Sequence, residues 1–166
     1  MSSPDQSTPD QSTAEQDPSR ASGTTVAAIL TQVATAEALA AACAIGKHVV
    51  DAVPSPIGAY AVLVDPSGDR PAELASAVSG LVKTVPLILF EATDGHITAS
   101  QWLAGLRGED LPAALVLDGA PHEFEDVLLG SVAASEVEGA VSSKGMSRWK
   151  AARSLAASRR APRGRR

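Results

Sequence analysis

Three acidic residues directly follow short apolar runs that are typical of β-strands. Asp65, Glu91 and Asp118 each end a stretch of Val, Leu, Ile or Phe. In a parallel sheet the loops that follow the strands converge at one edge, so these carboxylates would meet there. Carboxylate oxygens at such an edge hold Mg²⁺ together with water or phosphate. The three residues are therefore candidate metal ligands of a small magnesium- or nucleotide-dependent enzyme, although an Asp after a strand is also a common turn initiator.

Histidines next to carboxylates form a second candidate site. Asp94 with His96, and His122 with Glu123 and Asp126, have the side chains needed for acid–base chemistry or metal binding. Neither group has the spacing of a known metal motif. Solvent exposure of the turns that contain them accounts equally well for their presence.

Motifs for nucleophilic catalysis and for nucleotide binding are missing from the sequence. There is no G-x-S-x-G, no G-x-x-x-x-G-K-[ST] and no G-x-G-x-x-G. Cys43 falls within an Ala-rich helical pattern and is expected to be buried and unreactive. A non-catalytic binding or regulatory role is therefore favoured over an enzymatic one, and no cofactor is expected.

The charge of the chain is divided sharply along its length. The last 23 residues, 144–166, contain nine of the fourteen Lys and Arg residues and no acid, whereas residues 24–143 contain fifteen acids against four bases. The net charge of −5 and the pI near 5.1 conceal this division. A basic arm on an acidic body indicates an anionic partner, or an arm that folds back on its own domain.

Within the basic segment, apolar residues recur at helical spacing between Met146 and Ala156. This pattern predicts a short basic amphipathic helix, with Trp149 as the anchor that orients it on a partner. The Arg-rich end of the segment suits phosphate, because a guanidinium group can donate two parallel N–H groups to it. The predicted anion-binding residues are Arg148, Lys150, Arg153, Arg159, Arg160, Arg163, Arg165 and Arg166.

Several partners would fit such a segment. A nucleic acid backbone, including that of ribosomal RNA, ranks first, and it would bind in a strongly salt-dependent way. An anionic membrane surface ranks lower because the apolar stripe is narrow. An acidic protein surface, on this domain or on another subunit of an oligomer, is a further alternative. A solubilising extension without a partner also accounts for the charge, and base-specific recognition is not expected.

The remaining elements follow from hydrophobic periodicity and from turn residues. Strands are predicted at 26–31, 48–53, 57–64, 86–90 and 113–117, and helices at 36–45, 72–83, 99–106 and 124–141, the last interrupted or bent near Gly130. Thr35 is the predicted N-cap of the first helix, with Gly46 just past its end, and Pro71 begins the second. The alternation predicts one small α/β domain whose mostly parallel sheet of about five strands is flanked by helices. The short link between residues 53 and 57 leaves an α+β fold, with helices on one sheet face, as the alternative.

The predicted organisation has three parts. Residues 1–23, rich in Ser, Thr, Pro, Asp and Gln, are expected to be a disordered acidic tail; residues 24–143 form the α/β domain; and residues 144–166 form the basic helix and arm. A single cysteine excludes an intramolecular disulfide. The sequence has neither a secretory signal pattern nor an apolar run that could span a bilayer, so the cytoplasm is the expected location.

Overall fold

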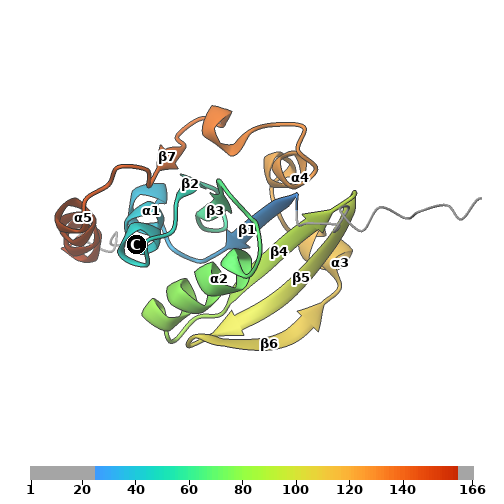
Figure 1. The fold of residues 1–166 in the computed structure, drawn as a ribbon, viewed down its shortest axis with the longest axis horizontal. Helices are drawn as coiled ribbons and strands as arrows, with labels where there is room; N and C mark the ends of the chain where they lie inside the picture. Colours follow the sequence, from blue (N-terminus) through green and yellow to red (C-terminus); the bar gives the residue numbers. More distant parts are fainter. Residues whose placement is uncertain (1–24, 161–166) are drawn as a thin grey trace, which may run out of the picture.

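The computed structural model describes residues 25–160, with side chains described as far as residue 157. The disorder predicted for residues 1–23 lies outside this range. In chain order the elements are β1 (Val26–Leu30), α1 (Ala36–Ile45), β2 (Val50–Val53), β3 (Tyr60–Leu63), α2 (Arg70–Leu81), β4 (Leu87–Thr93), β5 (His96–Leu103), β6 (Leu106–Leu111), α3 (Ala113–Asp118), α4 (His122–Leu128), the 3₁₀ helix η1 (Ala134–Glu136), β7 (Val141–Ser142) and α5 (Arg148–Arg160) (Figure 1).

The strands of the described residues form one antiparallel sheet in the order β6-β5-β4-β1-β3-β2-β7. The prediction of a mostly parallel sheet of about five strands is therefore wrong. The first part of the chain, from β1 to β4, has the β-α-β-β-α-β order of the ferredoxin-like arrangement. The β5–β6 hairpin extends the sheet at one edge, and β7 extends it at the other.

The error has a topological cause. Helix α1 connects β1 to β2, which run in the same direction but have β3 between them, and α2 connects β3 to β4, which have β1 between them. Each crossover therefore skips one strand position, and every pair of neighbours is antiparallel. The short link after Val53 is an antiparallel connection, as its length required. Alternating strands and helices arise in both arrangements, so the alternation alone cannot distinguish them.

The local signals in the first half of the chain are confirmed. The Thr35 side chain caps α1 by accepting a hydrogen bond from the N–H of Ala38, at 3.2 Å. Pro71 lies in the first turn of α2. At the end of α1, however, the left-handed residue is Lys47, with φ 63°, and not Gly46, with φ −73°.

Three predictions in the second half of the chain are wrong. Residues 99–106, predicted as a helix, belong to β5 and the turn into β6; the strand predicted at 113–117 is helix α3; and the helix predicted at 124–141 ends at Leu128 in α4. Two tight turns account for the extra strands. Asp94–Gly95 and Ala104–Gly105 both have positive φ angles, which is the geometry of two-residue hairpin turns.

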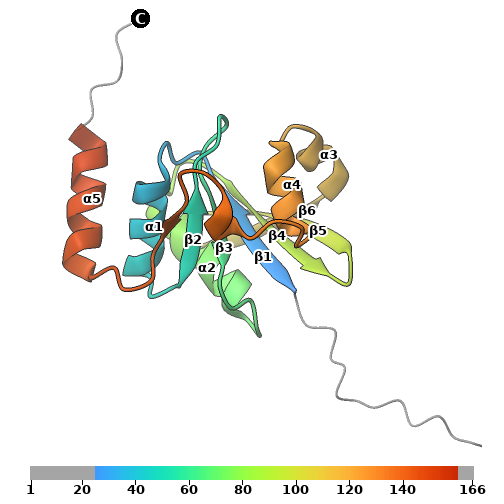
Figure 2. The same cartoon turned by 90° about the horizontal axis from the view of Figure 1, so that it is seen from above.

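Helices cover both faces of the sheet, so the alternative with helices on one face is also wrong. Helices α1 and α2 pack on one face, around Ile29, Leu39, Leu74, Val78 and Leu89. Helix α4 packs on the other, where Phe124 makes edge-to-face ring contacts with Tyr60 and Phe90 at centroid distances of 4.7 and 5.2 Å. Figure 2 shows the sheet between these two layers.

Candidate nucleic-acid interface

The basic C-terminal segment forms the predicted helix, α5, which lies alongside α1 at one end of the molecule (Figures 1 and 2). The chain reaches α5 through β7, which pairs with β2. Just after β7, the Ser143 backbone N–H donates to the Val50 carbonyl at 2.9 Å. The Ser143 hydroxyl accepts from the Val50 N–H and donates to the His48 carbonyl, both at 2.9 Å. These hydrogen bonds fix the point from which α5 starts.

Helix α5 packs on α1 through small apolar side chains. On its sheet-facing side, α1 buries Ala36, Leu39, Ala40 and Cys43. Its other side, which α5 covers, carries the equally buried Ala38, Ala41 and Ala42. From α5, Ala151 is fully buried, and Leu155 lines a cavity of about 630 Å³ together with Ala38 and Ala42. The described contact between the two helices is therefore apolar and does not use the charges of α5.

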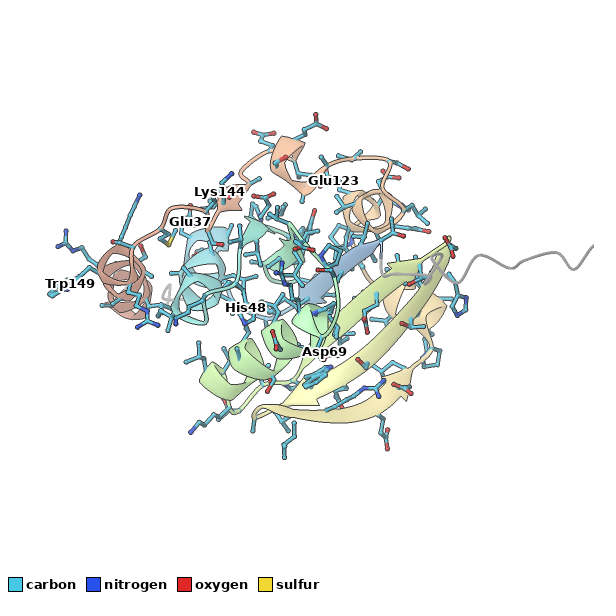
Figure 3. All side chains as sticks on the ribbon, in the orientation of Figure 1. Glu37, His48, Asp69, Glu123, Lys144 and Trp149 are labelled. Atoms are coloured by element: carbon cyan, nitrogen blue, oxygen red, sulfur yellow. The ribbon has the colours of Figure 1, made fainter. Side chains whose placement is uncertain are left out.

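Outside this contact, α5 exposes its aromatic and basic residues. Trp149 is 80% exposed, and Figure 3 shows it on the side of α5 that points away from α1. Arg148, Lys150 and Arg153 are exposed on the same helix. Among residues 25–157, no ion pair joins these three cations to an acidic side chain. The exposed surface of α5 therefore carries Trp149 together with three cations and is cationic. The side chains of Arg159 and Arg160, and the whole of Arg163, Arg165 and Arg166, lie outside the described residues.

A group of acidic residues occupies the other end of the molecule. Figure 2 places α3 and α4 at the opposite end of the molecule from α5. These helices carry the exposed residues Asp118, Glu123, Glu125 and Asp126. A polyanion at α5 therefore stays clear of this acidic group, although the exposed Glu37 lies on α1, the helix on which α5 packs.

The three candidate metal ligands occupy separate parts of the structure. Asp65 lies in the exposed loop after β3, where hydrogen bonds from the Ser67 side chain and backbone lower its pKa, and where it pairs with Arg70. Glu91 lies within β4. Asp118 ends α3, which packs on the sheet face opposite to α1 and α2. No group of three or more His, Cys, Asp or Glu residues in the described part of the chain could hold a metal ion. The antiparallel sheet removes the common edge on which the hypothesis depended.

Two polar cavities combine residues that the sequence did not connect. One, of about 520 Å³, lies between the end of α1 and the start of α2 and is lined by Lys47, His48, Asp65, Arg70 and Glu73. Burial lowers the pKa of His48, and the nearby Glu73 carboxylate partly offsets this shift. The sequence analysis missed this group because Lys47 and His48 lie far along the chain from Asp65, Arg70 and Glu73, and only the folding of β3 beside β2 brings them together.

The second cavity, of about 450 Å³, lies beside the β4–β5 turn. It is lined by Asp118 and by His122 and Glu125, whereas the sequence hypothesis grouped His122 with Glu123 and Asp126. His96 is exposed at the start of β5, and Asp94 occupies the left-handed position of the preceding turn. The cavity brings the β4–β5 turn, through Gly95 and Ile97, beside His122, but neither Asp94 nor His96 lines it.

The single cysteine is buried in α1, as expected. Burial raises the pKa of the Cys43 thiol to about 12, so the thiol stays protonated at neutral pH and cannot act as a nucleophile. None of the helices in residues 25–160 is both long enough and apolar enough to cross a membrane. Comparison of the chain with protein-family models, with curated proteins and with solved structures gives no match.

Proposed function

We propose that this protein is a non-catalytic binding protein whose basic C-terminal segment engages an anionic partner, foremost the phosphate backbone of a nucleic acid. One observation carries the proposal. Helix α5 packs on α1 through apolar side chains, and its Arg148, Lys150 and Arg153 are exposed to solvent with no acidic partner among the described residues. A fixed helix with unpaired cations is preorganised for phosphate contacts, since little ordering is required on binding.

The same packing distinguishes this segment from a solubilising extension. A segment that only added charge would need no contact with the domain, whereas α5 buries Ala151 completely and is tethered through Ser143. The position of the cationic surface is therefore set by the fold. This placement supports a surface that recognises a partner.

The test is binding to heparin and to mixed RNA or DNA at two salt concentrations. The full chain should bind in a salt-sensitive way, and a chain ending at Ser143 should not, because each phosphate contact releases counterions. A chain of that length keeps the Ser143 hydrogen bonds to β2.

A charge-matched pair of variants makes the test sharper. Arg148→Gln with Arg153→Gln should weaken binding and flatten its salt dependence. Lys47→Gln with Arg107→Gln removes the same charge from exposed positions outside α5 and should leave binding unchanged. Equal loss in both variants would mean that net charge alone governs binding. Absence of binding by the full chain would overturn the proposal.

A further inference from the structure

Two tryptophans occupy opposite environments. Trp102 in β5 is 7% exposed and donates its indole N–H to the Ser100 hydroxyl at 3.1 Å. Trp149 on α5 is 80% exposed and lies on the side that faces away from the domain (Figure 3). A buried Trp contributes a large apolar area to a core, so an outward-facing Trp adds nothing comparable to folding. The fold positions the Trp149 ring at the surface, where a flat partner can contact it.

Three cations lie on the same helix as this ring. Arg153 is four residues beyond Trp149, which places it on the same face of the helix, whereas Arg148 and Lys150 are its neighbours in sequence and project to either side of that face. All three are exposed. An aromatic face surrounded by cations is the combination that proteins use for single strands, in which bases stack on aromatic rings and phosphates contact Lys and Arg.

We propose that α5 binds single-stranded nucleic acid, with an unpaired base stacked on the Trp149 indole and the adjacent phosphates on Arg148, Lys150 and Arg153. This inference rests on the proposed function and narrows its partner. In a duplex the faces of the bases are covered by their neighbours, so only an unpaired base can stack on a side chain. Stacking accepts every base, because each has a π-face, which agrees with a surface that has no set of base-reading side chains.

The packing of α5 disfavours a membrane as the partner. Membrane binding by an amphipathic helix depends on the apolar area that it buries in the lipid. Here the fully buried Ala151 faces the domain, Met146, just before α5, packs against the core cluster beneath α1 and α2, and Leu155 lines the cavity beside α1. Apart from Trp149, the exposed apolar residues of the described part of α5 are alanines. Too little apolar surface remains for insertion.

The test measures binding of the full chain to an oligothymidine of twelve nucleotides, an abasic strand of the same length and a duplex with the same number of phosphates. We expect the oligothymidine to bind most tightly and to quench the emission of Trp149, while the buried Trp102 provides the internal reference. Trp149→Ala should weaken oligothymidine binding about 5- to 150-fold, the effect of losing one stacked base. Trp149→Phe should keep most of the affinity, and Trp149→Ala should not change binding to the abasic strand.

Each contrary outcome identifies what has failed. Equal affinity for oligothymidine and duplex, or no effect of Trp149→Ala, would overturn stacking and leave the phosphate-binding function in place if heparin still binds. Polyglutamate that binds as tightly as oligothymidine, with the same dependence on Trp149, would overturn the assignment in favour of an acidic protein. The same result with vesicles containing phosphatidylserine would overturn it in favour of a membrane. Failure to bind heparin or any of the strands would overturn the proposed function itself. Trp149 is exposed, so its variants should keep the melting temperature of the parent chain.

Discussion

The hydroxyl of Ser143 accepts a hydrogen bond from the backbone N–H of Val50, at 2.9 Å, and so fastens the chain that leads into α5 to strand β2. The same hydroxyl donates to the His48 carbonyl. Val50 is fully buried and Ser143 nearly so. The position of the cationic helix therefore depends on hydrogen bonds made inside the domain, before the helix begins.

Replacing Ser143 with Ala should lower the free energy of unfolding. The Val50 N–H would stay buried without its side-chain acceptor, and an unsatisfied buried donor costs about 1–3 kcal/mol. Urea unfolding measures the change. Ser142→Ala is the matched control, because the exposed Ser142 hydroxyl accepts only from the Lys144 N–H at the surface. If both variants unfolded at the same urea concentration, the Ser143 hydrogen bonds would not be the tether.

Replacing Ala151 with Leu should loosen α5 from α1. Ala151 is fully buried between the helices, and additional methylene groups in a closely packed contact cost about 1–3 kcal/mol. Limited trypsin digestion should then cleave faster at Arg148, Lys150 and Arg153. Ala152→Leu places the same side chain at an exposed position and should leave the cleavage rate unchanged. Resistance of the Ala151→Leu variant to trypsin would show that α5 is not held by this contact.

Local signals in the sequence predict the first half of the fold well, because those signals act locally. Thr35 caps α1 by accepting a hydrogen bond from a residue three positions away, and Pro71 lies in the first turn of α2, where its fixed φ suits a helix. Local signals do not predict whether neighbouring strands run parallel or antiparallel, since that depends on which strands of the whole chain become neighbours. The insertion of β3 between β1 and β2 makes the sheet antiparallel, and no local pattern in those segments reports that insertion.

The second half shows where pattern reading fails. The run Ala113–Leu117 is apolar enough for a strand, yet it begins directly after Pro112 and forms a helix that shields a sheet face. Ala104 adopts a left-handed conformation, with φ 52°, which an alanine does not predict. It completes the turn from which β6 begins. Loss of the strand before Asp118, together with the antiparallel sheet, also removes the basis of the predicted carboxylate site.

The exposure of Trp149 could be predicted only in part. Helical spacing of the apolar residues between Met146 and Ala156 predicts the helix, with Trp149 as its anchor. The sequence could not show that the alanines on the outer side of α1 form the surface on which the apolar side of α5 packs. That contact turns Trp149 outward, and it is what separates the aromatic ring from the rest of the apolar stripe.

Replacing Tyr60 with Phe should raise the free energy of unfolding. The Tyr60 hydroxyl is buried and has no hydrogen-bond partner among the described residues, and burial raises its pKa to about 12, with a smaller contribution from Glu123. Removing an unpaired buried hydroxyl should stabilise the protein by about 1 kcal/mol, while the ring keeps its edge-to-face contact with Phe124. Thermal unfolding measures the change. Tyr60→Leu should instead destabilise, because it also removes the ring; a loss of stability in Tyr60→Phe would show that the hydroxyl has a partner such as a bound water.

Stability should fall as the pH drops below about 6.5, the ordinary pKa of a histidine, and His48 should contribute to that fall. Burial lowers the pKa of His48 in the folded protein, despite the opposing effect of Glu73, so the unfolded chain takes up the proton first. Acid therefore favours unfolding over the interval from the unfolded pKa down to the lower folded pKa, and above this interval His48 has no effect. Urea unfolding of the parent chain and of His48→Gln at pH 7.5 and 5.5 should show a smaller loss in the variant. His96→Gln replaces an exposed histidine and should behave like the parent chain; an unchanged loss in His48→Gln would place the acid-sensitive group elsewhere.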